Sequence, residues 1–179
     1  MGSLGSWRKI VKMRVFVKIA CFSIGAVMLN APATLAQTGN PIVDYRKKTR
    51  TLLDSRCPQE FLPDVPMQTQ HSNCIALIDK LKQERAGFKG DGFQATQIWA
   101  DQHLNWNVSL TYAHLALKYI GADKGLSANA CGYAISWKNY IDKIKPEYEN
   151  IAANFEKMKT TAYAVKDQCA ANGYKSALE

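Results

Sequence analysis

Residues 99–121, WADQHLNWNVSLTYAHLALKYIG, decide the fold of this chain. Large or apolar side chains and one histidine return there every three or four residues, at Trp99, His103, Trp106, Leu110, Ala113, Leu117 and Ile120. This spacing places them on one face of an α-helix. Gly121 is the residue type that often follows a helix end. The stretch therefore predicts a helix of roughly 26 residues, which is about 39 Å long at 1.5 Å per residue.

Helical periodicity also occupies most of the surrounding sequence. Four more helices are expected, at 41–57, 72–86, 126–145 and 148–172. Pro41 suits a first helical position, Ser72 can cap the second helix, and Pro146 ends the fourth. Residues 57–72 contain three prolines and have no period, which predicts a loop. Because short connections favour antiparallel neighbours, we expect an all-α, up-down bundle of four to five helices.

Residues 1–36 have the features of a cleaved signal peptide of bacterial export. Five basic residues and no acidic residue precede the apolar run 19–29, and the segment ends in Ala33-Thr34-Leu35-Ala36. The run is too short to span a bilayer comfortably, so a transmembrane anchor is the less favoured interpretation. We expect residues 37–179 to be a single helical domain, periplasmic or secreted, with no membrane span after cleavage.

Four cysteines lie beyond the predicted signal peptide: Cys57, Cys74, Cys131 and Cys169. An even number in an exported domain predicts two disulfides. In an up-down bundle all four fall toward one end, and we expect the pairs Cys57–Cys74 and Cys131–Cys169. The second pair needs a bend or shift, because Cys169 lies about 13 Å further along its helix than Cys131. Zinc is the disfavoured alternative, since no Cys-x-x-Cys spacing occurs.

The dense basic group of the exported part is Arg46, Lys47, Lys48 and Arg50. Nucleic-acid-binding domains gather many basic residues on one face, whereas this group is short and lies on the first helix. We interpret it as a solvated helix face and expect no nucleic-acid partner.

His103 is the histidine with two interpretations. Its position between Trp99 and Trp106 favours a neutral ring that is hydrogen-bonded inside an aromatic layer. The alternative pairs His103 with Met158, because both lie at similar heights in their helices and such a pair can ligate a b-type haem in a helical bundle. We expect no cofactor and no metal, with haem or a metal as the alternative.

Catalytic motifs are missing from the sequence. It has no Gly-x-Ser-x-Gly turn, no His-Glu-x-x-His pair and no pair of carboxylates placed by spacing at a cleft. Its cysteines are expected to be oxidised. We therefore expect that the protein is not an enzyme.

A binding role remains, with two segments that offer apolar side chains to a protein partner. Phe61 and Met67 lie in the proline-bearing segment, and Phe88 and Phe93 lie in a glycine-rich connection. These side chains can equally fold back onto the bundle. The sequence predicts an exported binding protein, such as an inhibitor, an immunity factor or an accessory subunit of an envelope or secretion assembly.

Overall fold

A computed structural model describes residues 40–145, 147 and 149–174. They form five helices: α1 (Pro41–Arg56), α2 (Met67–Gly87), α3 (Gln94–Ala122), α4 (Ala128–Ile141) and α5 (Glu149–Ala171). This part of the chain contains no strand, so the all-α prediction is confirmed. The predicted signal peptide, residues 1–36, lies outside the described residues.

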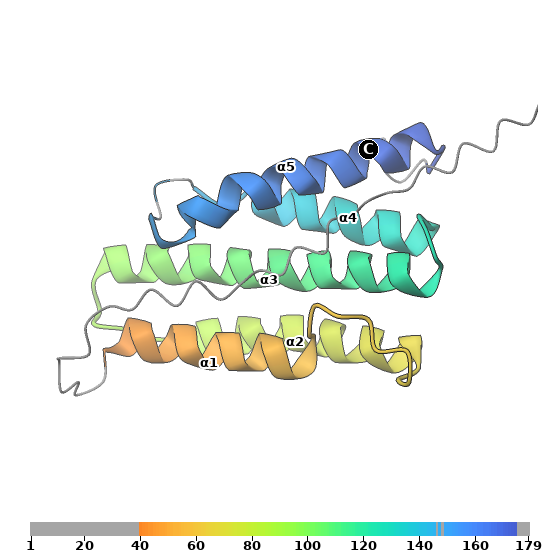
Figure 1. Cartoon of the computed structure of the whole chain (residues 1–179). Coiled ribbons are helices and arrows are strands. Elements are labelled where there is room, and N and C mark those ends of the chain that lie inside the picture. Colours follow the sequence, from red (N-terminus) through yellow and green to blue (C-terminus); the bar gives the residue numbers. More distant parts are fainter. Residues whose placement is uncertain (1–39, 146, 148, 175–179) are drawn as a thin grey trace, which may run out of the picture. The chain divides into compact units, whose positions relative to one another are not determined.

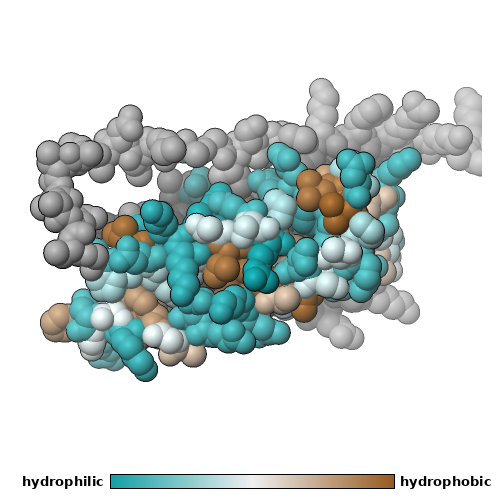
Figure 2. Space-filling model, turned by 90° about the horizontal axis from the view of Figure 1, so that it is seen from below, coloured by the Kyte–Doolittle hydropathy of each residue, from teal (hydrophilic) through white to brown (hydrophobic). Residues whose placement is uncertain are grey.

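Consecutive helices run in alternating directions, as predicted (Figure 1). α3 is central: α1 and α2 pack on one side of it, and α4 packs on the other side and carries α5. Thirteen of the 29 residues of α3 are buried. Figure 2 views the bundle from the side of α1 and α2, where the surface is mainly hydrophilic and the apolar patches are small and separate.

Two helix starts follow the capping rules. The Asn40 side chain accepts a hydrogen bond from the Ile42 N–H at 3.0 Å, and Pro41 begins α1. The Ser127 hydroxyl accepts a hydrogen bond from the Ala130 N–H at 3.2 Å at the start of α4. These side chains satisfy backbone N–H groups that have no partner within the helix.

The predicted bounds of α2 and α4 were wrong. α2 begins at Met67 instead of Ser72, because the Pro66 carbonyl accepts hydrogen bonds from Thr69 and Gln70 and opens the helix there. α4 ends at Ile141 and does not extend to Pro146. The chain makes a tight turn directly after Ile141, in which the Ile144 N–H donates a hydrogen bond to the Ile141 carbonyl. Ile144 is still buried, so this apolar residue packs in the core although it lies beyond the end of the helix.

Two apolar clusters meet at α3. One joins α1, α2 and α3 around Leu53, Leu77 and Leu115. The other joins α3, α4 and α5 around Trp137, Ile141 and Phe155. Among the described helices, none is long and apolar enough to cross a membrane.

Both predicted disulfides are present. Cys57–Cys74 ties the end of α1 to α2, and Cys131–Cys169 ties α4 to α5, with Cα–Cα distances of 4.8 and 5.7 Å. The anticipated offset between Cys131 and Cys169 is absorbed because α5 begins well past the end of α4 (Figure 1).

Candidate functional site

The connection between α2 and α3 is a fixed loop rather than a flexible one. Gly90 and Gly92 have φ angles of +58° and +82°, which favour glycine. The Asp91 carboxylate accepts a hydrogen bond from the Phe93 N–H at 3.0 Å, and the Gln97 amide donates to the Lys89 carbonyl at 2.7 Å. Hydrogen bonds from the Thr96 side chain and then from the Phe93 backbone lower the pKa of Asp91. The loop therefore presents its side chains in a defined geometry.

The two phenylalanines of this loop have different environments. Phe88 is partly buried, and its ring lies 4.5 Å from the ring of Tyr45 on α1. Phe93 is 70% exposed, the most exposed among the large apolar side chains whose burial the structure describes. Ile98, on the first turns of α3, is also exposed. Phe88 thus anchors the loop, while Phe93 faces solvent.

The proline-bearing segment before α2 is held against the bundle. Phe61 and Met67 are both partly buried, and Phe61 lies over Gly121 so closely that a Cβ there would be 3.3 Å from the Phe61 Cβ. The Gln70 amide donates to the carbonyls of Leu62 and Val65, each at 2.8 Å. These contacts hold Phe61 and Met67 partly buried against the bundle, while Leu62 of the same segment is 37% exposed.

His103 is a hydrogen-bonded ring in an aromatic layer. It stacks on Trp99 with ring centroids 4.9 Å apart, and its Nε2 lies 2.9 Å from the Thr49 hydroxyl oxygen. The Thr49 hydroxyl oxygen also lies 2.9 Å from the Tyr45 carbonyl oxygen. Burial, aided by the charge of Arg46, lowers the pKa of His103 to about 4. The ring is therefore neutral at pH 7.

Met158, the other residue of the haem hypothesis, lies on α5 and packs against both apolar clusters. The His103 side chain is hydrogen-bonded to Thr49 on α1. α1 and α5 lie on different sides of α3 (Figure 1). Within the described residues, no group of three or more His, Cys, Asp or Glu side chains is placed to hold a metal ion. A haem ligated by His103 and Met158 stays a prediction.

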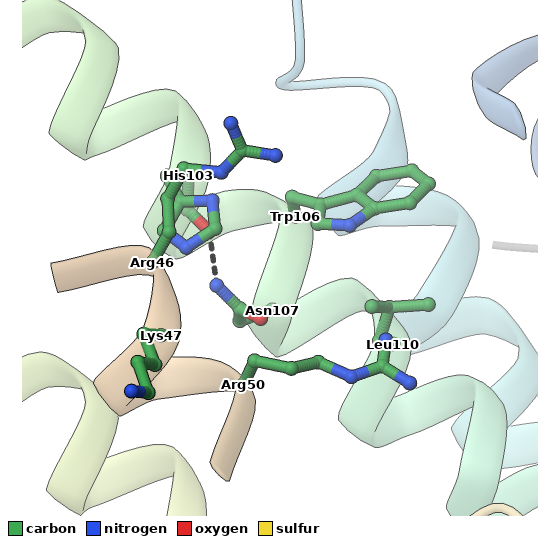
Figure 3. Close-up of a pocket in the computed structure, with 7 residues that line it drawn as sticks. All are labelled: Arg46, Lys47, Arg50, His103, Trp106, Asn107 and Leu110. Carbon is green, nitrogen blue, oxygen red and sulfur yellow. Dashed lines mark hydrogen bonds between the residues drawn. The ribbon is translucent and has the colours of Figure 1, made fainter. Parts of the chain in front are cut away.

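A surface pocket of about 280 Å³ lies between α1 and α3. It is lined by Arg46, Lys47, Arg50, His103, Trp106, Asn107 and Leu110. Figure 3 shows Arg46 and Arg50 extending from α1 toward α3, with the Trp106 indole beyond them. The basic group on α1, interpreted from sequence as a solvated face, therefore also forms one wall of a pocket.

Sequence reasoning missed a second aromatic cluster on α2, α3 and α4. Its members are His71, Tyr112, Tyr119, Tyr133 and Tyr140. Both ring nitrogens of His71 are engaged, with the Tyr119 hydroxyl at 2.8 Å and the Tyr133 hydroxyl at 3.0 Å. Tyr112 and Tyr119 are seven residues apart on α3, as are Tyr133 and Tyr140 on α4. This spacing places both members of each pair on the same face of their helix, and it is the signal from which the cluster could have been predicted.

No protein-family model matches this chain, and neither a curated protein nor a solved structure does. Function has to be inferred from the described surfaces. Two of these surfaces stand out in the described part of the chain. The α2–α3 loop exposes the apolar ring of Phe93 to solvent, and the pocket is lined by the cations Arg46 and Lys47, which have no ion-pair partner there.

Proposed function

We propose that this chain is an exported binding protein that inserts Phe93 into an apolar pocket of a protein partner. The observation that carries this proposal is the 70% exposure of Phe93 on a loop fixed by hydrogen bonds. A rigid aromatic loses little conformational entropy on binding, which is why such residues often dominate protein interfaces. An inhibitor, an immunity factor and an accessory subunit of an envelope assembly are the three forms this role can take.

Export is supported by the two disulfides and by the signal-like pattern of residues 1–36. A periplasmic or secreted protein meets its partner in an oxidising compartment, where the fold stays cross-linked. The disulfides tie the helices together, and the loop hydrogen bonds hold the backbone that carries the contact residue. The role we propose is binding without catalysis.

Site-specific photocrosslinking tests this function. A benzophenone amino acid at position 93 is expected to capture one discrete envelope protein in cells. The same group at position 163, where the exposed Tyr163 lies on α5, is the matched control and is expected to capture none. The captured protein is then identified by mass spectrometry and purified.

Affinity for the purified partner completes the test. Phe93→Ser is expected to weaken binding about tenfold or more, since loss of a buried aromatic contact costs at least about 1.4 kcal/mol. Tyr163→Ser is expected to change the dissociation constant by less than about twofold. If Phe93→Ser binds the partner as tightly as the wild-type protein, the proposed contact is wrong.

A further inference from the structure

The pocket between α1 and α3 has a cationic wall and an apolar wall. Arg46, Lys47 and Arg50 supply the first from adjacent turns of α1. Trp106 and Leu110 supply the second from α3. In Figure 3 the two arginine side chains reach across toward this apolar wall. The site therefore offers charge and a flat hydrophobic surface within one small volume.

The positive charge of the pocket is only partly neutralised by the protein. Arg50 pairs with Asp54 at 2.8 Å. In the described part of the chain, Arg46 and Lys47 have no ion-pair partner, and no acidic side chain lines the pocket. An arginine that reaches into a pocket without a counter-charge favours an oxyanion, which the guanidinium can bind in a bidentate way.

The rest of the pocket is preorganised. The Asn107 amide donates to the His103 carbonyl at 2.8 Å, and the His103 ring is held by Thr49 and by stacking on Trp99. Its volume of about 280 Å³ lies just below the range of roughly 300–1,000 Å³ that is usual for drug-sized ligands. The site therefore fits one small group with an apolar part, and a bare inorganic ion would leave the Trp106 wall without a partner.

We propose that this pocket binds a small organic anion, with a carboxylate or phosphate held by the Arg46 guanidinium and an apolar body lying against Trp106. This site is separate from the Phe93 loop, so the proposal stands independently of the protein partner. The same ligand chemistry occurs in free small molecules and in acidic groups of polymers, and the test has one arm for each source.

Nuclear magnetic resonance can follow the Trp106 indole N–H while the purified, disulfide-bonded protein is titrated. Phenyl phosphate is the free-ligand probe and poly-glutamate is the polymer probe. Inorganic phosphate supplies only the anionic half of the ligand, and benzyl alcohol supplies only the apolar half. Phenyl phosphate is expected to bind saturably and about tenfold or more tightly than either half. Tighter, saturable binding of poly-glutamate at the same resonance supports the site and assigns a polymer as its source. If neither phenyl phosphate nor poly-glutamate saturates the Trp106 resonance, the proposal is overturned.

Charge variants separate this site from general electrostatic attraction. Arg46→Gln is expected to weaken the saturating probe about tenfold or more. Lys48→Gln is the matched control, because Lys48 lies on the same helix but pairs with Glu84 at 2.5 Å and does not line the pocket. The control is expected to stay within about twofold of the wild-type affinity. Equal weakening by both changes would show nonspecific attraction and would also overturn the proposal; circular dichroism checks that each variant is folded.

Discussion

The ammonium group of Lys118 lies 3.1 Å from the side-chain oxygen of Gln70, at a position where Lys118 is only 1% exposed. The same ammonium donates to the Glu60 carbonyl. Because Gln70 also bonds the carbonyls of Leu62 and Val65, these two side chains tie the proline-bearing segment to α2 and α3. Burial lowers the pKa of Lys118, which is the cost of placing a cation at the centre of this network.

Lys118→Ala is expected to lower the free energy of unfolding by about 2 kcal/mol, because it leaves the acceptors of Glu60 and Gln70 without their donor. Urea unfolding at pH 7 measures the change. Lys89→Ala, at an exposed site on the α2–α3 loop, is the control and is expected to stay within about 0.5 kcal/mol of the wild-type value. A Lys118→Ala variant as stable as this control would contradict the role of the network.

Removal of the disulfides is expected to destabilise the protein, and the loss grows with the logarithm of the length of the loop that each one closes. The sequence separations are 17 for Cys57–Cys74 and 38 for Cys131–Cys169. In the chain-entropy model the two bridges contribute about 3 and about 4 kcal/mol. Urea unfolding of Cys57→Ala/Cys74→Ala and of Cys131→Ala/Cys169→Ala tests both values, and a larger loss for the first pair would contradict the ordering.

The disulfide pairing and the helix count could be predicted from sequence because both depend on patterns with a local cause. Apolar periodicity marks a helix wherever one face is buried. Antiparallel order then brings Cys131 and Cys169 to the same end of the bundle. The start of α2 could not be predicted in this way, because Pro66 opens the helix through its carbonyl without a side-chain cap.

The environment of α3 was less predictable because this helix is buried on more than one face. The predicted face included Leu110 and Ala113, which are buried, but Val108 and Leu115, outside that pattern, are completely buried as well. A single apolar stripe is expected of a helix that packs against one layer of helices, whereas α3 lies between two layers. The pocket was equally hidden, since it needs the basic residues of α1 on one wall and Trp106 on the other, and these lie 56 to 60 residues apart in the sequence.

Acid is expected to destabilise the protein through its buried histidines. His114 Nδ1–H donates to the Cys57 carbonyl at 2.6 Å, and burial lowers the pKa of His114 to about 4, as it does that of His103. The ordinary histidine pKa is about 6.5, so the unfolded chain binds more protons than the native protein below that pH. The stability due to these groups is present above pH 6.5 and is lost as the pH falls toward 4.

Unfolding in urea at pH 7 and at pH 4.5 tests this dependence. His114→Gln removes the titrating group while keeping an N–H donor for the Cys57 carbonyl, and is expected to reduce the acid-induced loss by on the order of 2 kcal/mol. Equal acid sensitivity in the wild-type protein and the His114→Gln variant would contradict this account.

The glycines of the α2–α3 loop give a matched pair of substitutions. At Gly90, where φ is +58°, a Cβ would come within 2.7 Å of the buried Thr96 side chain. Gly90→Ala is therefore expected to cost about 1–3 kcal/mol, from the left-handed backbone and from this overlap. At Gly87 a Cβ would meet nothing within 4 Å, and Gly87→Ala is expected to be neutral or to stabilise α2 by up to about 1 kcal/mol. Urea unfolding compares the two variants, and equal stability would mean that the loop is not held in the conformation that presents Phe93.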